Sequence, residues 1–95
     1  MAANPRTIAF SVGGPIARSD LPGLCDRVCA LLGRSGAALA LCDVRGVPAD
    51  AVTADALSRL QLGARRHACQ VRLRNASSEL LELLAFMGLE DVLPE

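Results

Sequence analysis

Three short segments of the chain either alternate between apolar and polar residues or are continuously apolar, which is the spacing typical of β-strands. They lie near residues 7–12, 37–43 and 69–74. In the first segment Ile8, Phe10 and Val12 fall on one face. The second is apolar almost throughout, so we expect a central strand that is covered on both faces. The third alternates regularly and should keep one face toward solvent.

Between these segments, apolar residues recur at spacings of three and four, which predicts amphipathic helices. The helices should cover residues 20–32, 53–66 and 78–87. Ser19 or Asp20 is placed to cap the first helix, and Gly33 and Gly36 should end it. Because strands and helices take turns along the chain, we predict one α/β domain with a mostly parallel sheet and helices packed against it.

The second and third helices differ in how much of their surface is apolar. The second has one apolar stripe, formed by Ala54, Leu57, Leu60 and Ala64. The third is apolar nearly all round, and its apolar residues include Leu83, Leu84, Phe86 and Met87. We expect this helix to be buried, with a contact to another chain, such as a weak homodimer, as the alternative. Ser77 or Ser78 should cap it and Gly88 should end it, followed by a hydrophobic contact of Leu89.

Composition narrows the class of protein. The 95 residues include ten arginines, no lysine and ten acidic residues, so the formal net charge is zero and nucleic-acid binding is disfavoured. Arg65 and Arg66 with Arg72 and Arg74 form either a local basic patch or an ordinary solvated face. No apolar run reaches the ~20 residues that span a bilayer, and the start of the chain lacks a signal-peptide pattern. We expect a cytoplasmic domain with a flexible N-terminus at residues 1–6.

The cysteines and the histidine favour neither a metal site nor a catalytic site. Cys25, Cys29, Cys42 and Cys69 form no CxxC pair, so we expect reduced thiols that pack as small hydrophobes, without a metal or other cofactor. A metal site that includes His67 is the alternative that the residue types leave open. A single histidine without a fixed nucleophile is too little to build a catalytic centre, so we expect the protein not to be an enzyme.

A connected series of features from about Leu39 onward resembles the STAS family, which includes bacterial anti-anti-sigma factors and domains attached to sulfate transporters. An apolar strand ends at Asp43, a short loop reaches Asp50 at a helix start, and the last helix is followed by Gly88-Leu-Glu-Asp-Val-Leu93. The resemblance implies a single STAS-like domain over residues 1–95 that docks on another protein. As an anti-sigma factor antagonist in bacterial transcription, it would bind an anti-sigma factor kinase.

The resemblance also implies where docking takes place, and leaves two other roles open. The site would be Asp50, Ala51, Val52, Thr53 and Asp55, together with the loop from Gly46 to Ala49. The alternatives to an anti-sigma factor antagonist are a STAS subunit on the ATPase of a lipid transporter and a ligand-sensing STAS domain.

The start of the second helix departs from the pattern of the family. Anti-anti-sigma factors commonly have Asp-Ser-Ser-Gly there, and the second serine is phosphorylated. This chain has Asp50-Ala-Val-Thr53, so the acceptor position falls on Val52, or on Thr53 when counted from Asp43. Unpaired N–H groups at a helix start would attract a phosphate or a partner's carboxylate, but the chemistry alone favours a simple helix cap for Asp50 and Thr53. We expect no phosphoserine switch.

Overall fold

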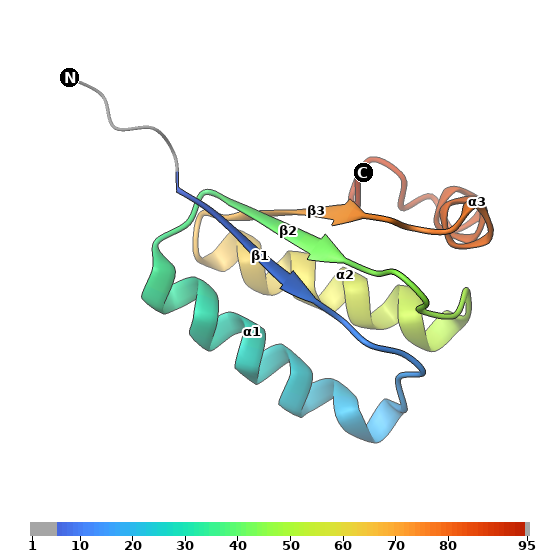
Figure 1. Cartoon of the computed structure of the whole chain (residues 1–95), viewed down its shortest axis with the longest axis horizontal. Helices are drawn as coiled ribbons and strands as arrows, with labels where there is room; N and C mark the ends of the chain where they lie inside the picture. Colours follow the sequence, from blue (N-terminus) through green and yellow to red (C-terminus); the bar gives the residue numbers. More distant parts are fainter. Residues whose placement is uncertain (1–5, 95) are drawn as a thin grey trace.

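Strands and helices alternate along the chain as the hydrophobic spacing predicts (Figure 1). The computed structural model describes residues 6–94. The strands are β1 (Thr7–Ser11), β2 (Leu39–Asp43) and β3 (Gln70–Arg74). The helices are α1 (Leu21–Ser35), α2 (Ala51–Arg66) and α3 (Ser78–Phe86), with a single 3-10 turn, η1 (Arg18–Asp20), before α1. The predicted parallel α/β architecture and all six element positions are confirmed.

The N-terminus was predicted to be flexible over residues 1–6, of which residues 1–5 lie outside the described part of the chain. Arg6 is held in place. Its carbonyl accepts a hydrogen bond from the Ala38 N–H at 2.9 Å, and its guanidinium donates to the Ser35 carbonyl at 3.0 Å. Arg6 thus joins β1 to the end of α1, and the flexibility of the N-terminus stays a prediction.

All three strands are parallel, in the order β1-β2-β3. Both crossovers advance in the same direction across the sheet, and right-handed crossovers of this kind place their helices on the same face. Accordingly, α1 and α2 lie side by side under the sheet, and α3 lies beyond the end of β3 (Figure 1). The prediction that β2 is covered on both faces is wrong: Leu39 and Leu41 point away from α1 and α2 and are half-buried.

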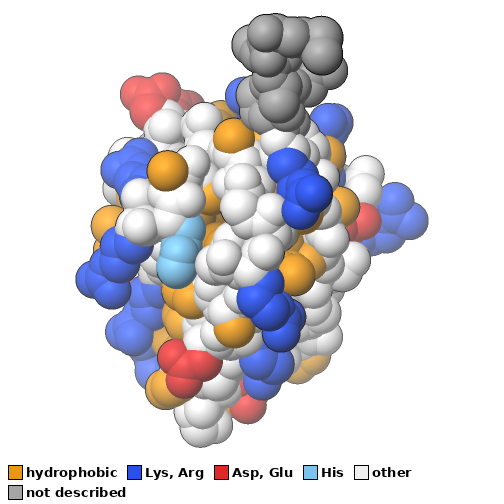
Figure 2. All heavy atoms as spheres, turned by 90° about the vertical axis from the view of Figure 1, so that its left-hand side faces the viewer, with side chains coloured by type: hydrophobic (Ala, Val, Ile, Leu, Met, Phe, Trp, Pro, Cys, Tyr) orange, Lys and Arg blue, Asp and Glu red, His pale blue; other side chains and the backbone are white. Residues whose placement is uncertain are grey.

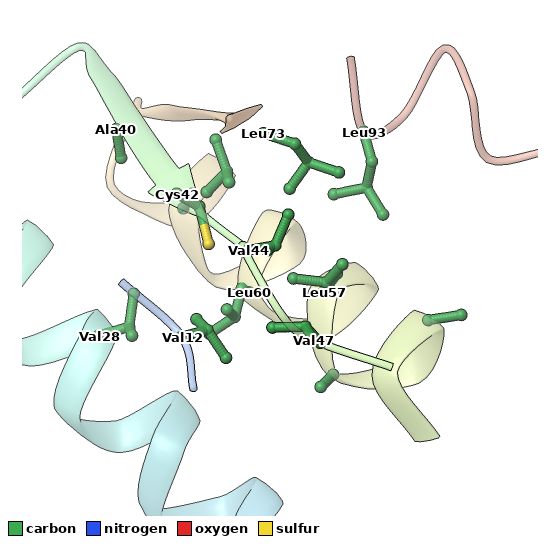
Figure 3. Close-up of a cluster of buried hydrophobic side chains, with 14 of the residues drawn as sticks. Val12, Val28, Ala40, Cys42, Val44, Val47, Leu57, Leu60, Leu73 and Leu93 are labelled. Atoms are coloured by element: carbon green, nitrogen blue, oxygen red, sulfur yellow. The ribbon is translucent and has the colours of Figure 1, made fainter. Parts of the chain in front are cut away.

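The core fills the space between the sheet and the two helices beneath it (Figure 3). Aliphatic side chains make up most of it, because the chain has two phenylalanines and no other aromatic residue. The fully buried residues from the strands include Ala40, Cys42, Val71 and Leu73, and those from α2 include Ala54, Leu57, Leu60 and Ala64. The predicted apolar stripe of α2 is therefore confirmed, and β3 has one solvated face as predicted.

Helices α1 and α2 approach closely at two glycines. A Cβ atom on Gly63 of α2 would lie 2.6 Å from the Cys29 Sγ of α1. Gly33 of α1 lies against the ring of His67, the residue that ends α2. Gly33 remains helical, so the prediction that it ends α1 is wrong. Gly36 ends the helix instead, in the left-handed conformation that favours glycine (φ 62°).

Two helix boundaries that were predicted from side-chain chemistry are confirmed. Ser77 caps α3 by accepting a hydrogen bond from the Leu80 N–H at 3.1 Å. At the other end Gly88 is left-handed (φ 75°), and the Leu89 N–H donates to the Leu84 carbonyl at 2.7 Å. This bond belongs to the Schellman motif, in which glycine lets the chain turn back on the last helical turn.

The predicted cap of α1 is only partly confirmed. Asp20 occupies the position before the first helical residue, but its side chain does not bond to the N–H groups of α1. It accepts a hydrogen bond from the Ala17 N–H at 3.1 Å and thereby closes the 3-10 turn η1. The aspartate therefore stabilises the entry to the helix instead of the helix itself.

The outer edge of β3 is closed by a buried glutamine of α2. Gln61 has 1% of its surface exposed. Its Oε1 accepts a hydrogen bond from the Val71 N–H at 2.8 Å, and its Nε2 donates to the Val71 carbonyl at 3.1 Å and also to the Val92 carbonyl. The Leu73 N–H on the same edge donates to the Pro94 carbonyl. A side chain and the C-terminal segment thus replace a fourth strand.

Helix α3 is not buried all round as predicted. Leu80 and Leu84 are buried, but the Phe86 side chain is 88% exposed and Met87 is 46% exposed. Because α3 extends beyond the sheet instead of lying under it, the core reaches only one side of the helix. No helix in the described part of the chain is long and apolar enough to cross a membrane.

Candidate functional site

The carboxyl ends of the three strands lie at the same end of the sheet, and the loops that follow them form the candidate site. In α/β proteins with parallel sheets, ligands bind outside the carboxyl ends of the strands, where loops and helix N-termini converge. The loop after β1 contacts the loop after β2: a Cβ on Gly14 would lie 2.6 Å from the Pro48 Cδ. The sequence between Val44 and Asp50 then leads into α2.

The start of α2 is built around the carboxylate of Asp50. Its Oδ1 accepts a hydrogen bond from the Thr53 N–H at 2.8 Å, which makes Asp50 the N-cap of the helix. This N–H lowers the pKa of the Asp50 carboxyl. Ala51 is exposed and Val52 is half-buried, so the first turn presents a small apolar surface next to an exposed acidic cap. The prediction that Asp50 is a helix cap is confirmed.

Thr53 faces the protein interior. Its side chain is fully buried, and its hydroxyl oxygen makes no hydrogen bond of regular geometry. The Thr53 hydroxyl also lowers the pKa of the Asp50 carboxyl, but less than the Thr53 N–H does. A kinase cannot reach this oxygen while the first turn is intact. Regulation by phosphorylation of Thr53 would therefore require α2 to open locally.

Asp55 links α2 to the segment that precedes α1. Its carboxylate pairs with the Arg59 Nε at 3.0 Å, one turn along α2, and with the Arg18 Nη1 at 3.3 Å. The bond from Arg59 is the main cause of a lowered pKa for Asp55. Exposed pairs of this kind contribute little to stability, but the two guanidinium groups neutralise the acid. The exposed negative charge at this end of α2 is thus mainly that of Asp50.

Asp43 organises the ends of β2 and β3. Its carboxylate accepts hydrogen bonds from the Arg45 N–H at 2.9 Å and from the Asn75 Nδ2 at 3.2 Å. The Arg45 N–H is the main cause of its lowered pKa. Asp43, Arg74 and Asn75 border a shallow hollow of about 430 Å³ on the uncovered face of the sheet. Asp43 therefore shapes two loops and is not free to act as a base.

The three aspartates predict how stability changes in acid. Each has a folded-state pKa below its ordinary value, so each stabilises the fold above about pH 4 and loses this effect as the pH falls through the folded-state pKa. We expect the urea midpoint to fall as the pH is lowered below about 4. Asp50→Asn keeps a capping oxygen but cannot titrate, so its midpoint should fall less over this range.

Asp26→Asn, which changes an exposed aspartate in the middle of α1, is the matched control for this measurement. It should leave the acid response as in the wild type. An acid response of Asp50→Asn as steep as that of the wild type would contradict the assigned role of the cap.

Three of the four cysteines have thiols that burial makes less reactive. All four are free. Burial raises the pKa of Cys42 to about 12, and burial is also the main cause of raised pKa values for Cys25 and Cys69. A raised pKa keeps the thiol protonated and unreactive at neutral pH. Within residues 6–94 no group of three or more His, Cys, Asp or Glu is placed to hold a metal ion, and a metal-free protein stays a prediction.

Arginines gather at the opposite end of the molecule, where α1 and α2 finish (Figure 2). The exposed residues there are Arg6, Arg34, Arg65 and Arg66. Cations are favoured at helix C-termini because the helix dipole is negative there. Arg72 and Arg74 lie on the uncovered face of β3 instead, so the predicted patch of four arginines is divided between two surfaces.

The predicted site residues are therefore contiguous, but they differ in solvent exposure. Asp50, Ala51 and Val52 reach the surface, Asp55 is half-buried in its ion pairs, and Thr53 is inside. Sequence reasoning did not include Arg18 or Asn75, because their partners are more than 30 positions away along the chain. No known family model matches the sequence, and no curated protein is significantly similar to it.

Proposed function

We propose that this protein is a non-catalytic docking domain, and that it acts as an anti-sigma factor antagonist of the kind that the STAS resemblance implies. The observation that supports it best is the surface at the start of α2. We define the α2 docking surface as Arg45, Gly46, Asp50, Ala51 and Val52. These residues are exposed or half-buried, they lie in the loop after β2 and at the start of α2, and the cap and the bonds of Asp43 hold them in place.

The chemistry of this surface fits a protein partner better than a small substrate. The carboxylates of Asp43, Asp50 and Asp55 at this end of the molecule already accept hydrogen bonds from backbone N–H groups or an arginine, so none of them is poised as a nucleophile or base. The unpaired charge of Asp50 and the small side chain of Ala51 allow a partner to approach the helix start closely. A cationic group of the partner would pair with Asp50.

The burial of Thr53 changes the expected mode of regulation. Val52 has no hydroxyl and the Thr53 hydroxyl is inside, so the position that corresponds to the family's phosphoserine offers no accessible acceptor. Partner abundance would then control docking, without a phosphorylation cycle. Incubation with the partner kinase and ATP should leave residues 50–55 unlabelled.

Substitutions at exposed positions test the docking surface without disturbing the core. Ala51→Arg places a long cation beside Asp50 and should weaken binding to the anti-sigma factor kinase at least tenfold, about 1.4 kcal/mol, because it blocks the helix start and cancels the exposed acid. Ala30→Arg is the matched control, since Ala30 is an exposed alanine in the middle of α1. Titration calorimetry with the purified kinase measures both affinities.

Equal affinities for the wild type and Ala51→Arg would remove the α2 docking surface from the interface. Circular dichroism of both variants should show unchanged folding, because neither position is buried. If no anti-sigma factor kinase binds the wild-type chain at all, the anti-sigma role itself is wrong.

A further inference from the structure

The two outer edges of the sheet differ in whether their backbone N–H and C=O groups are hydrogen-bonded. Gln61 and the C-terminal segment close the edge of β3, as described above. Within residues 6–94 no strand lies beyond β1. The Val12 N–H donates to the Asp43 carbonyl of β2. Because backbone groups of alternate residues in a strand point to opposite sides, Thr7, Ala9 and Ser11 direct their N–H and C=O groups away from the sheet.

The open edge of β1 has none of the features that usually prevent strand pairing. Edge strands are commonly protected by proline, charged side chains or a bulge. β1 reads Thr-Ile-Ala-Phe-Ser, contains neither proline nor charge, and keeps a regular register with β2 over its whole length. A row of unpaired backbone groups in such a strand is suited to receive another strand.

A groove of about 540 Å³ runs below this edge, between β1 and α1. Its apolar lining includes Phe10, Leu24 and Leu31, which are all only half-buried. Asp20 and Arg27 also border it, so the groove has one acidic and one basic group instead of a single sign of charge. Apolar side chains of an added strand would lie over this lining and complete its burial.

We propose that β1 pairs with β1 of a second copy of this chain, antiparallel and centred on Ala9, to form one continuous six-stranded sheet. A two-fold axis requires this direction, because the same residues must face each other in both copies. Ala9 would lie opposite Ala9, and Thr7 opposite Ser11. All the outward N–H and C=O groups of these residues would then be bonded.

The side chains are compatible with this register. On the uncovered face of the sheet Thr7, Ala9 and Ser11 are small, so they meet without a clash. On the face that packs against the helices, Ile8 of each copy would lie beside Phe10 of the other. Pairs of an aromatic and a β-branched residue stabilise antiparallel strands. Both residues are half-buried in the single chain. The pairing therefore covers apolar surface that the chain alone leaves partly open.

Self-association through the other exposed apolar region is less favourable. Phe86 and Met87 at the end of α3 are near Glu79, Glu82 and Glu90, and residues 75–94 contain no basic residue. Two copies that met there would bring acidic groups together, and like charges oppose association. The uncharged edge of β1 has no such conflict.

Two double variants test the register, because each changes the same pair of exposed positions. In Thr7→Lys/Ser11→Lys, lysines of the two copies would face each other twice, and we expect association to weaken at least about fivefold. In Thr7→Lys/Ser11→Glu, each lysine would face a glutamate, and association should equal or exceed that of the wild type. Sedimentation velocity over a range of concentrations measures both.

Gln70→Lys is the control, since Gln70 is exposed on the same sheet but on the closed side. It should associate like the wild type. Amide exchange gives an independent readout: the Ala9 N–H should become protected as the concentration rises, and the Phe10 N–H, which faces β2, should stay protected throughout.

A wild-type chain that remains monomeric up to about 1 mM would overturn the proposal. Equal association of the two double variants would also overturn it, because charge at positions 7 and 11 would then not be opposed across the interface. Circular dichroism of the variants, whose changed side chains are exposed in the single chain, establishes that any loss of association is not a loss of folding.

Discussion

Replacing Gln61 by leucine is expected to lower the free energy of unfolding by about 3 to 5 kcal/mol, a large share of the roughly 5 to 15 kcal/mol that stabilises a domain. The substitution leaves the buried N–H and C=O of Val71 and the half-buried C=O of Val92 without their partner. Each unsatisfied group costs about 1 to 3 kcal/mol. Leucine restores part of this loss through its apolar surface. Urea unfolding followed by circular dichroism measures the change.

Gln70→Leu is the matched control for this prediction. It makes the same chemical change on the exposed face of β3, so it should alter stability by no more than about 0.5 kcal/mol. Amide exchange at Val71 should accelerate in Gln61→Leu and remain slow in the control. A change in unfolding free energy below about 1 kcal/mol for Gln61→Leu would show that the glutamine does not stabilise the edge of β3.

Gly63→Ala is expected to destabilise the protein by about 1 to 2 kcal/mol, although alanine favours helix formation by up to about 1 kcal/mol over glycine. The added Cβ would lie 2.6 Å from the Cys29 Sγ, so α1 and α2 must move apart. Truncation of Cys29 to alanine removes the obstacle. In the double variant Cys29→Ala/Gly63→Ala, the second substitution should therefore be neutral or stabilising.

Gly33→Ala provides the control within the same helix pair. Its Cβ would meet the His67 ring at 3.4 Å, which is an ordinary contact. This variant should be neutral or more stable than the wild type by up to about 1 kcal/mol, because only helix propensity changes. Additive effects of Cys29→Ala and Gly63→Ala in a double-mutant cycle would contradict the proposed contact between these residues.

Together these predictions distinguish two kinds of interaction. Gln61 satisfies backbone groups at an edge, so its loss is a loss of hydrogen bonds. Gly63 allows two helices to approach, so its replacement is a steric change that a second substitution can relieve. The docking surface and the edge of β1 depend on neither, because their residues lie outside the core.

Local features were predictable from the sequence because their partners are close along the chain. The six elements follow from the period of apolar residues, and the parallel direction of the strands follows from their alternation with helices. The cap at Asp50 and the turn at Gly88 depend on residues at most five positions apart. Hydrogen bonds from a side chain to the next helical turn form wherever the backbone takes up that conformation. The apolar stripe of α2 was predictable for the same reason.

Only the tertiary structure decided which surfaces are covered. Gln61 is polar, and nothing nearby in sequence shows that it meets Val92, 31 positions away. Period alone shows which residues share a face, but not whether a neighbour covers that face. The sheet is covered on one side, and Thr53 is buried beneath it, because both crossovers turn the same way. Phe86 is exposed because α3 continues past β3. The open edge of β1 follows from that same topology.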